Sequence, residues 1–238
     1  MDGRGLVAKS IDGAVFAAWL AAYAVLLATG AYTDFLRPAL WPILVGAGTM
    51  LAAFLATLAL RQRPAPRDGW LARLVRAGLL LLPLAYLLAA RGEILGSYAY
   101  GKRALAGGGL SATGRPLATT AAVPDDEPTA ALDLDQIWEG GQRLCGRRVV
   151  TEGMVFLDAS VPEGFFVLFR FVMICCAADV QPIGVYVRHA DAAKMEPDAW
   201  ACVTGRIGTM EVAGEEVPAL DAEKVETIPR PGNPYLYP

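Results

Sequence analysis

Two long stretches without a charged residue constrain this chain more than any other feature. They cover residues 13–33 and 38–60, and a helix needs about 20 such residues to cross a bilayer core of about 30 Å. A third apolar stretch, residues 77–90, is shorter, but flanking arginines would extend it by snorkelling. We predict transmembrane helices at about 11–33, 38–60 and 73–94. An interfacial or re-entrant helix is the alternative for the third.

Basic residues predict the orientation. Most arginines near the predicted helices fall between the second apolar stretch and the third: Arg61, Arg63, Arg67, Arg73 and Arg76. Only Arg37 lies between the first and the second. The positive-inside rule then places the Arg-rich loop and the N-terminus in the cytoplasm, and everything after Arg91 outside it. We expect a multi-pass protein of the plasma (inner) membrane.

Composition and charge restrict the partners. With 55% hydrophobic residues and a mean hydropathy of +0.39, the chain is too apolar for a soluble globule. Residues 1–110 carry a net charge of +6 and the remainder −9, which add up to the −3 of the whole chain. A basic apolar half suits a lipid bilayer, whereas an acidic half repels phosphate. We therefore expect no nucleic-acid partner.

The chain divides into three regions. Residues 1–100 hold the transmembrane helices, and residues 101–131, rich in Gly, Ala, Ser, Thr and Pro, are predicted to be a flexible linker. Residues 132–238 are predicted to form the extracytoplasmic domain. It would begin with a short helix, capped by Asp133 or Asp135, that runs toward Leu144 and is buried against the strands.

The last ninety residues have the pattern of a small β domain. β-branched and aromatic residues alternate with glycine-containing breaks, which predicts strands at residues 148–156, 165–176, 183–188, 200–207 and 217–228. Five strands of this length fit an OB-like barrel, or a compact sandwich as the alternative. The predicted fold class is an α-helical membrane anchor followed by a small all-β domain, with an OB-like barrel preferred.

Arg170 is the exception in a strand that is otherwise apolar on both faces. Such a residue needs an acceptor or a path to solvent. A structural ion pair is the preferred interpretation, with Asp158, Asp179 or Asp191 as partner, and binding of an anionic ligand is the alternative.

The four cysteines, Cys145, Cys175, Cys176 and Cys202, all lie in the half predicted to be outside, where disulfides are permitted. Adjacent strand residues point in opposite directions, so Cys175 and Cys176 can share a metal only if the strand ends and the chain turns. Asp179 would then join them, although the spacing is not a recognised zinc motif. Three interpretations stay open: a metal site such as zinc, a disulfide from Cys145 or Cys202 to the pair, and small buried hydrophobes.

Most of the chain resembles a known family. The segment 167–179 with its Cys-Cys-Ala-Ala-Asp block, followed by 182–187, resembles the YcgQ-like family of two-component permease subunits. Segments 146–153, 200–205 and 229–237 agree with it. The resemblance implies an accessory subunit beside a larger multi-span permease, and it marks Arg170, Cys176, Ala178 and Asp179, with Cys175 less directly. The loop between the second and third helices lacks the histidines of some relatives, which opposes a metal-delivery role for that loop.

These observations predict an accessory membrane subunit whose extracytoplasmic domain binds or gates beside a permease. The uncharged first two helices offer no ion pathway, so the chain is not expected to transport by itself. Nucleotide-binding loops and the nucleophile motifs of hydrolases are absent from the sequence, and we predict no enzymatic activity and no firmly bound cofactor. The alternatives are an envelope metal-binding or sensor protein that uses Cys175, Cys176 and Asp179, and a cell-surface thiol redox enzyme.

Overall fold

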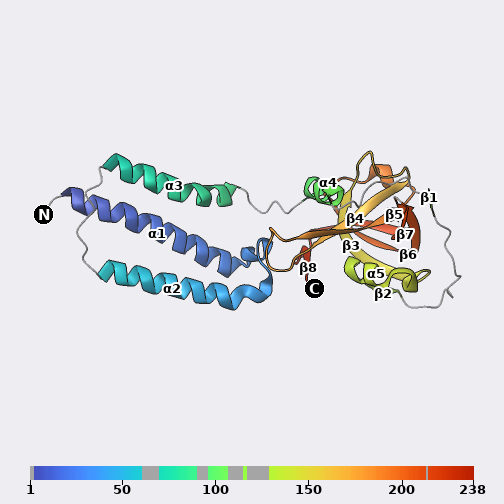
Figure 1. Ribbon diagram of the computed structural model, residues 1–238, viewed down its shortest axis with the longest axis horizontal. Coiled ribbons are helices and arrows are strands. Elements are labelled where there is room, and N and C mark those ends of the chain that lie inside the picture. Colours follow the sequence, from blue (N-terminus) through green and yellow to red (C-terminus); the bar gives the residue numbers. More distant parts are fainter. Residues whose placement is uncertain (1–2, 61–69, 90–95, 107–114, 117–128, 213) are drawn as a thin grey trace. The chain divides into compact units, whose positions relative to one another are not determined.

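The computed structural model describes residues 3–60, 70–89, 96–106, 115–116, 129–212 and 214–238. The chain forms two compact units, Met1–Glu93 and Ile94–Pro238 (Figure 1). The expected basic loop residues Arg61, Arg63 and Arg67, as well as Arg91, lie outside the described residues. So do residues 107–114 and 117–128 of the expected linker.

The first unit is helical, as its uncharged stretches predict. Its helices are α1 (Gly3–Thr29), α2 (Trp41–Leu60) and α3 (Trp70–Ala89), with the short 3₁₀ turns η1 (Ala31–Asp34) and η2 (Pro38–Leu40) between the first two. Gly30 has φ of +74°, which favours glycine and ends α1 before the expected residue 33. The third helix begins at Trp70, three residues before the predicted start, and contains Pro83, while the predicted residues 90–94 lie outside the described residues.

Contacts hold α1 against both other helices. The indole N–H of Trp19 donates to the carbonyl oxygen of Leu80 at 3.0 Å, and the Tyr23 hydroxyl donates to that of Leu44. A Cβ added to Gly48 would lie 2.6 Å from the Tyr23 ring. Gly48 therefore permits the close approach of α1 and α2.

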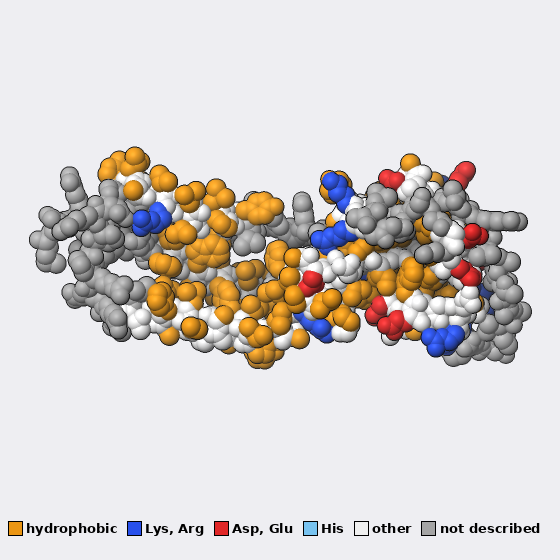
Figure 2. Space-filling model, viewed as in Figure 1, with side chains coloured by type: hydrophobic (Ala, Val, Ile, Leu, Met, Phe, Trp, Pro, Cys, Tyr) orange, Lys and Arg blue, Asp and Glu red, His pale blue; other side chains and the backbone are white. Residues whose placement is uncertain are grey.

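The helical unit presents apolar side chains on its surface. Within the described residues, one helical stretch, Pro38–Thr57, is long and apolar enough to cross a membrane by length and composition, with hydropathy 1.9 and none of it buried. Gly13–Thr29 is apolar but shorter. Met50 is 78% exposed, and hydrophobic side chains cover much of the visible surface of the helices (Figure 2). The structure thus supports a helical region with one candidate membrane span.

The second unit is built mainly from strands. It starts with α4 (Ser97–Ala106), β1 (Arg115–Pro116), β2 (Ala130–Ala131), α5 (Leu134–Gly140) and η3 (Gly141–Leu144). The main strands are β3 (Arg148–Phe156), β4 (Phe165–Val172), β5 (Gln181–Arg188), β6 (Trp200–Val212) and β7 (Glu215–Ile228), with η4 (Ala192–Lys194) before β6 and β8 (Tyr235–Leu236) at the end. All five predicted strands are present, and β3 has the predicted bounds. β4 ends four residues earlier than predicted, and β6 is longer by five.

The strand pairings form a partial ring. β3 pairs with β4 and β4 with β5 in antiparallel fashion, β5 pairs with β7 in parallel, and β7 pairs with β6 in antiparallel fashion. β6 also pairs with β3. The β6–β7 register shifts between Thr204 and Gly205, where a Cβ on Gly205 would lie 2.3 Å from the carbonyl oxygen of Asp221. Only glycine permits this close approach of the two strands.

Both faces of β4 are buried, as the sequence predicted. Phe166 and Leu168 join one core cluster, which also holds Leu134 and Ile137 of α5. Phe169 and Phe171 join the other. Asp133 is the residue before α5, and its backbone N–H donates to the Gln136 side chain at 2.9 Å, so the predicted cap and the predicted burial of this helix are confirmed.

The structure differs from the predicted linker at its beginning. Residues 101–106, expected to be flexible, belong to α4. Tyr100 of this helix is buried, and its ring lies 4.4 Å from that of Phe169 and 5.1 Å from that of Phe156. Arg103 donates to the carbonyl oxygen of Val180 at 2.9 Å. These tertiary contacts stabilise a helix in a segment whose small residues are typical of a flexible linker.

Candidate functional site

The Cys-Cys-Ala-Ala-Asp block lies in the connection between β4 and β5, residues 173–180. Met173 and Val180 at its two ends are buried in the core, and the Met173 N–H donates to the carbonyl oxygen of Leu236 at 2.8 Å. Between them the chain turns outward, with Cys175 exposed. The strand therefore ends before the cysteines. The two thiols could share a metal only if the strand ended and the chain turned, and the structure meets this requirement.

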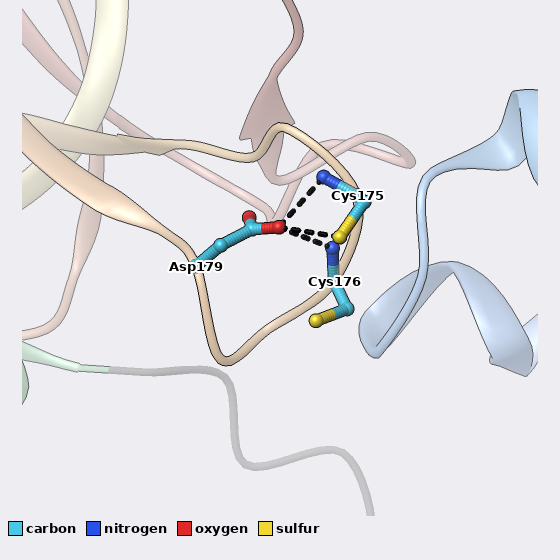
Figure 3. A group of neighbouring side chains, drawn as sticks. All are labelled: Cys175, Cys176 and Asp179. Atoms are coloured by element: carbon cyan, nitrogen blue, oxygen red, sulfur yellow. Dashed lines mark hydrogen bonds between the residues drawn. The ribbon is translucent and has the colours of Figure 1, made fainter.

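Asp179 closes this turn by accepting several hydrogen bonds (Figure 3). One carboxylate oxygen, Oδ1, accepts the backbone N–H of Ile174 at 3.0 Å. The other, Oδ2, accepts the backbone N–H groups of Cys175 at 2.9 Å and Cys176 at 3.0 Å, and the Cys175 thiol at 2.7 Å. The carboxylate thus organises three consecutive backbone amides and one sulfur around itself.

The hydrogen bonds shift two pKa values in opposite directions. The bond from the Cys175 thiol, together with the backbone N–H donors, lowers the pKa of Asp179 from 3.8 to about 2. The same bond to Asp179 raises the pKa of the Cys175 thiol from 9.0 to about 12. Ionised Asp179 stabilises the folded turn at pH values above the unfolded pKa of 3.8, and this stabilisation is lost as the pH falls toward 2. The protonated Cys175 thiol stabilises the folded turn below pH 9, and this stabilisation is lost as the pH rises toward 12. The closed turn is favoured across neutral pH.

The three side chains also satisfy a basic requirement of a metal site. The Sγ atoms of Cys175 and Cys176 and a carboxylate oxygen of Asp179 lie within 4.8 Å of one another. In a tetrahedral zinc site with Zn–S of about 2.3 Å and Zn–O of about 2.0 Å, sulfur and oxygen are about 3.5 Å apart. Replacing the thiol proton by a metal would therefore require the 2.7 Å contact to open modestly. Two thiolates and one carboxylate leave a further coordination position open.

Arg170 belongs to a different cluster. Its Nη1 lies 3.3 Å from Asp133 Oδ1 and 3.4 Å from Glu152 Oε1, and its guanidinium donates to the carbonyl oxygens of Asn233 and Pro234. It lies over the Trp200 ring, 5.7 Å from the centroid. Burial lowers its pKa, and the two carboxylates oppose that shift. The side chain is 5% exposed, so these partners balance its buried charge.

The preferred interpretation of Arg170, a structural ion pair, agrees with this cluster, but the predicted partners were wrong. The Asp179 carboxylate accepts hydrogen bonds from its own turn. Asp191 pairs with Lys194 at 2.6 Å, and Asp158 accepts the Ser160 N–H at 3.0 Å. The partners in the structure are Asp133, which directly precedes α5, and Glu152, which lies in β3. The structure brings Cys175, Cys176 and Asp179 together, and Arg170 contacts other segments.

The four cysteines are free thiols, and none is buried. The disulfide and the buried-hydrophobe interpretations therefore do not describe this structure. Burial and Glu216 raise the pKa of Cys145. Burial raises that of Cys202, with contributions from Glu152 and Glu226. Neither residue joins the turn.

Sequence reasoning missed the importance of Asp133 and Glu152 around Arg170. The sequence predicts Asp133 only as a helix cap and predicts no role for Glu152. One sequence signal was available, because Glu152 interrupts a strand of mostly apolar residues. It could not show which basic residue the carboxylate would meet.

Comparisons with known proteins find one family model that matches most of the β unit. Residues 131–238 match the family model described as DUF1980 C-terminal domain. No curated protein matches the chain. A chain of the solved structure described as yeast RPA bound to ssDNA matches with 13% identity over 45% of this chain and 81% of that chain, with a TM-score of 0.30. This score is too low to assign a fold or a ligand.

Proposed function

We propose that this chain, whose residues 131–238 form a DUF1980 C-terminal domain, is an accessory membrane subunit of a two-component permease complex. In this proposal the β domain is extracytoplasmic and binds or gates beside a larger multi-span permease. The resemblance to YcgQ-like permease subunits and the apolar helical region support it. The uncharged residues 13–33 and 38–60 favour helices that pack on a partner over helices that form an ion pathway.

We further propose that the turn formed by Cys175, Cys176 and Asp179 holds a transition metal ion such as zinc. The observation that carries this part is the convergence of the two thiols and the carboxylate within 4.8 Å on an accessible turn. Soft sulfur donors favour zinc and other thiophilic ions over calcium or magnesium. The open coordination position would let the ion pass to another ligand, which suits a subunit that works beside a permease.

The architecture that we propose for the domain is an OB-like barrel. The order β3-β4-β5-β7-β6, with β6 returning to β3, is the connectivity expected of a five-stranded Greek-key barrel. The parallel β5–β7 pair fits this order. Such a barrel would present residues 174–179 at the end of the β4–β5 hairpin, between the buried residues Met173 and Val180.

A second candidate is a self-standing envelope metal-binding or sensor protein, favoured by the same turn. We favour both over a thiol redox enzyme, because thiol catalysis needs a thiolate near neutral pH. The pKa values of Cys145, Cys175 and Cys202 are instead raised. We accordingly propose a role without thiol catalysis.

The orientation can be tested by reporter fusions. A periplasm-active reporter joined at Thr129 should be active, and the same reporter at Pro66 should be inactive, because the arginines around Pro66 favour the cytoplasm. A cytoplasm-active reporter at the same two positions provides the control and should give the reverse pattern. Periplasmic activity at Pro66, or its absence at Thr129, would show that the orientation is wrong.

The permease partner can be tested by co-purification. The tagged full chain, extracted from its native membrane in mild detergent, should retain one multi-span protein in near-stoichiometric amount, identified by mass spectrometry. An unrelated three-span protein with the same tag is the control. Recovery of the chain without an enriched multi-span partner would favour the self-standing metal-binding protein.

A further inference from the structure

The Cys175 turn, the connection of residues 173–180 between β4 and β5, is held at both ends by segments that are remote in the sequence. Its first residue, Met173, donates its backbone N–H to the carbonyl oxygen of Leu236 in β8 at 2.8 Å. Its last residue, Val180, accepts the guanidinium of Arg103 in α4 on its carbonyl oxygen at 2.9 Å. Neither contact is made by a proposed metal ligand.

Arg103 reaches the turn from a helix that other contacts fix in place. At the start of α4, Ser97 donates its hydroxyl to the Asp198 carboxylate at 3.0 Å. One turn further on, Tyr100 is 5% exposed, and its ring centroid lies 4.4 Å from that of Phe169. Arg103 follows Tyr100 by three residues and therefore lies on the same face of the helix. Packing that does not involve the turn thus directs the guanidinium toward it.

The other end of the turn is held by β8. This strand pairs in parallel with the end of β4, with Tyr235 opposite Phe171 and Leu236 opposite Val172. Both side chains of β8 are buried, and Arg170 donates to the carbonyl oxygens of the two residues that precede the strand. The chain therefore leaves the sheet at a fixed point.

The two ends together determine where the Asp179 carboxylate lies relative to the thiols. This carboxylate accepts the amides of Ile174, Cys175 and Cys176, which directly follow the first residue of the turn. Asp179 itself directly precedes the last residue of the turn. A shift of either end would move the carboxylate away from the thiols. In metal sites, groups that orient the ligands without binding the ion contribute to affinity in this way.

We propose that Arg103 is a positioning residue of the Cys175 turn, which fixes the Val180 carbonyl and thereby keeps Asp179 within reach of the two thiols. This inference rests on the metal site proposed above, because the benefit of a fixed turn is tighter metal binding. Arg103 acts through the backbone of the turn and is not itself a ligand. The contact comes from a side chain, so one substitution can remove it without changing the turn's own sequence.

The test measures zinc affinity by chelator competition on the purified full chain in detergent. Arg103→Met removes the donors and keeps most of the length of the side chain. Lys102→Met is the matched control, because Lys102 is the exposed neighbour in the same helix and lies over the Tyr98 ring. We expect Arg103→Met to weaken zinc binding by about tenfold, the lower end of the range for groups that orient metal ligands. The Lys102→Met protein should bind zinc as the wild type does.

A measurement without metal separates this inference from the metal site itself. Alkylation of Cys175 by N-ethylmaleimide, followed by mass spectrometry, reports how often its hydrogen bond to Asp179 opens, because the thiolate is the reactive form. We expect Arg103→Met to speed this alkylation severalfold and to leave the rates at Cys145 and Cys202 unchanged. A substitution that only lowered the stability of the whole domain would speed all three.

Equal zinc affinity of Arg103→Met and the wild type would overturn the positioning role and leave the metal site standing. Equal losses in Arg103→Met and Lys102→Met, or a rate at Cys175 that rises no more than those at the other two cysteines, would overturn the positioning role as well. A wild type that binds no zinc, together with faster Cys175 alkylation in Arg103→Met, would overturn the metal site and support the positioning of the turn. Thermal melts establish that the variants are folded, and Arg103→Gln replaces Arg103→Met if that protein does not fold.

Discussion

Replacing Arg170 with methionine should lower the free energy of unfolding of the β domain by about 3 kcal/mol. The substitution removes the guanidinium that joins β4 to Asp133, to Glu152 and to the carbonyl oxygens of Asn233 and Pro234. The two carbonyls would lose a donor. The expected loss of unfolding free energy lies at the lower end of the range for breaking a buried ion pair. The reason is that the Asp133 and Glu152 side chains are 53% and 38% exposed, so water can solvate them.

The measurement is denaturant unfolding of the full chain, with hydrogen exchange followed by mass spectrometry over residues 233–238. Exchange there should increase, because Arg170 holds Asn233 and Pro234 next to β8. Arg188→Met is the matched control: its ion pair with Asp221 is about half exposed, and its loss should change stability by about 1 kcal/mol or less. Equal effects of the two substitutions would contradict the structural role of Arg170.

Replacing Cys176 or Asp179 in the Cys175 turn should reduce zinc affinity by at least about 100-fold, because the proposed three-ligand site would lose one ligand. Cys176→Ser removes a thiolate. Asp179→Asn removes the carboxylate charge and keeps one oxygen for the backbone N–H groups of the turn. Cys202→Ser is the matched control, because Cys202 lies on β6 opposite Glu152 and not in the turn. The Cys202→Ser protein should bind zinc as the wild type does.

Zinc binding should also strengthen as pH rises from about 5 to about 8, because the metal must displace a proton from the Cys175 thiol. That proton is held firmly, since the hydrogen bond to Asp179 raises the pKa of the thiol to about 12. Chelator competition gives the affinities, and cobalt substitution gives a sulfur-to-metal absorption band as a direct signature of thiolate ligation. Wild-type protein that binds no zinc, or a Cys202→Ser protein that loses as much affinity as Cys176→Ser, would exclude this site. Unchanged binding in Cys176→Ser would do the same.

The sequence alone predicted those features that depend on neighbouring residues. The uncharged stretches gave the helical region, because a run of apolar residues has few alternatives to a helix with an apolar surface. Alternation gave the bounds of β3, and a strand with two apolar faces correctly indicated that β4 is covered on both sides. The cap at Asp133 also followed from a local pattern.

The cysteine turn was predictable in part for the same reason. Cys175, Cys176 and Asp179 are within five residues, so a bend after the strand was sufficient to bring them together. The sequence could not place the bend, and it extended the strand to Cys176 when it ends at Val172. The hydrogen bonds to Asp179 show why the chain turns earlier: one carboxylate collects the amides of Ile174, Cys175 and Cys176.

Only the tertiary structure decided which distant segments meet. Residues 97–106 form a helix although part of this segment has the composition of a linker, because Tyr100 packs on Phe156 and Phe169. The partners of Arg170 lie 37 and 18 residues away along the chain, and the return of β6 to β3 brings Cys202 opposite Glu152 beside Thr151. Local periodicity fixes which face of a strand is apolar, whereas the choice of neighbour depends on how all the buried faces pack at once. The sequence therefore determined most of the helices and strands and the residues of the turn, whereas the packing of the β domain decided the helix at residues 97–106 and the charge cluster around Arg170.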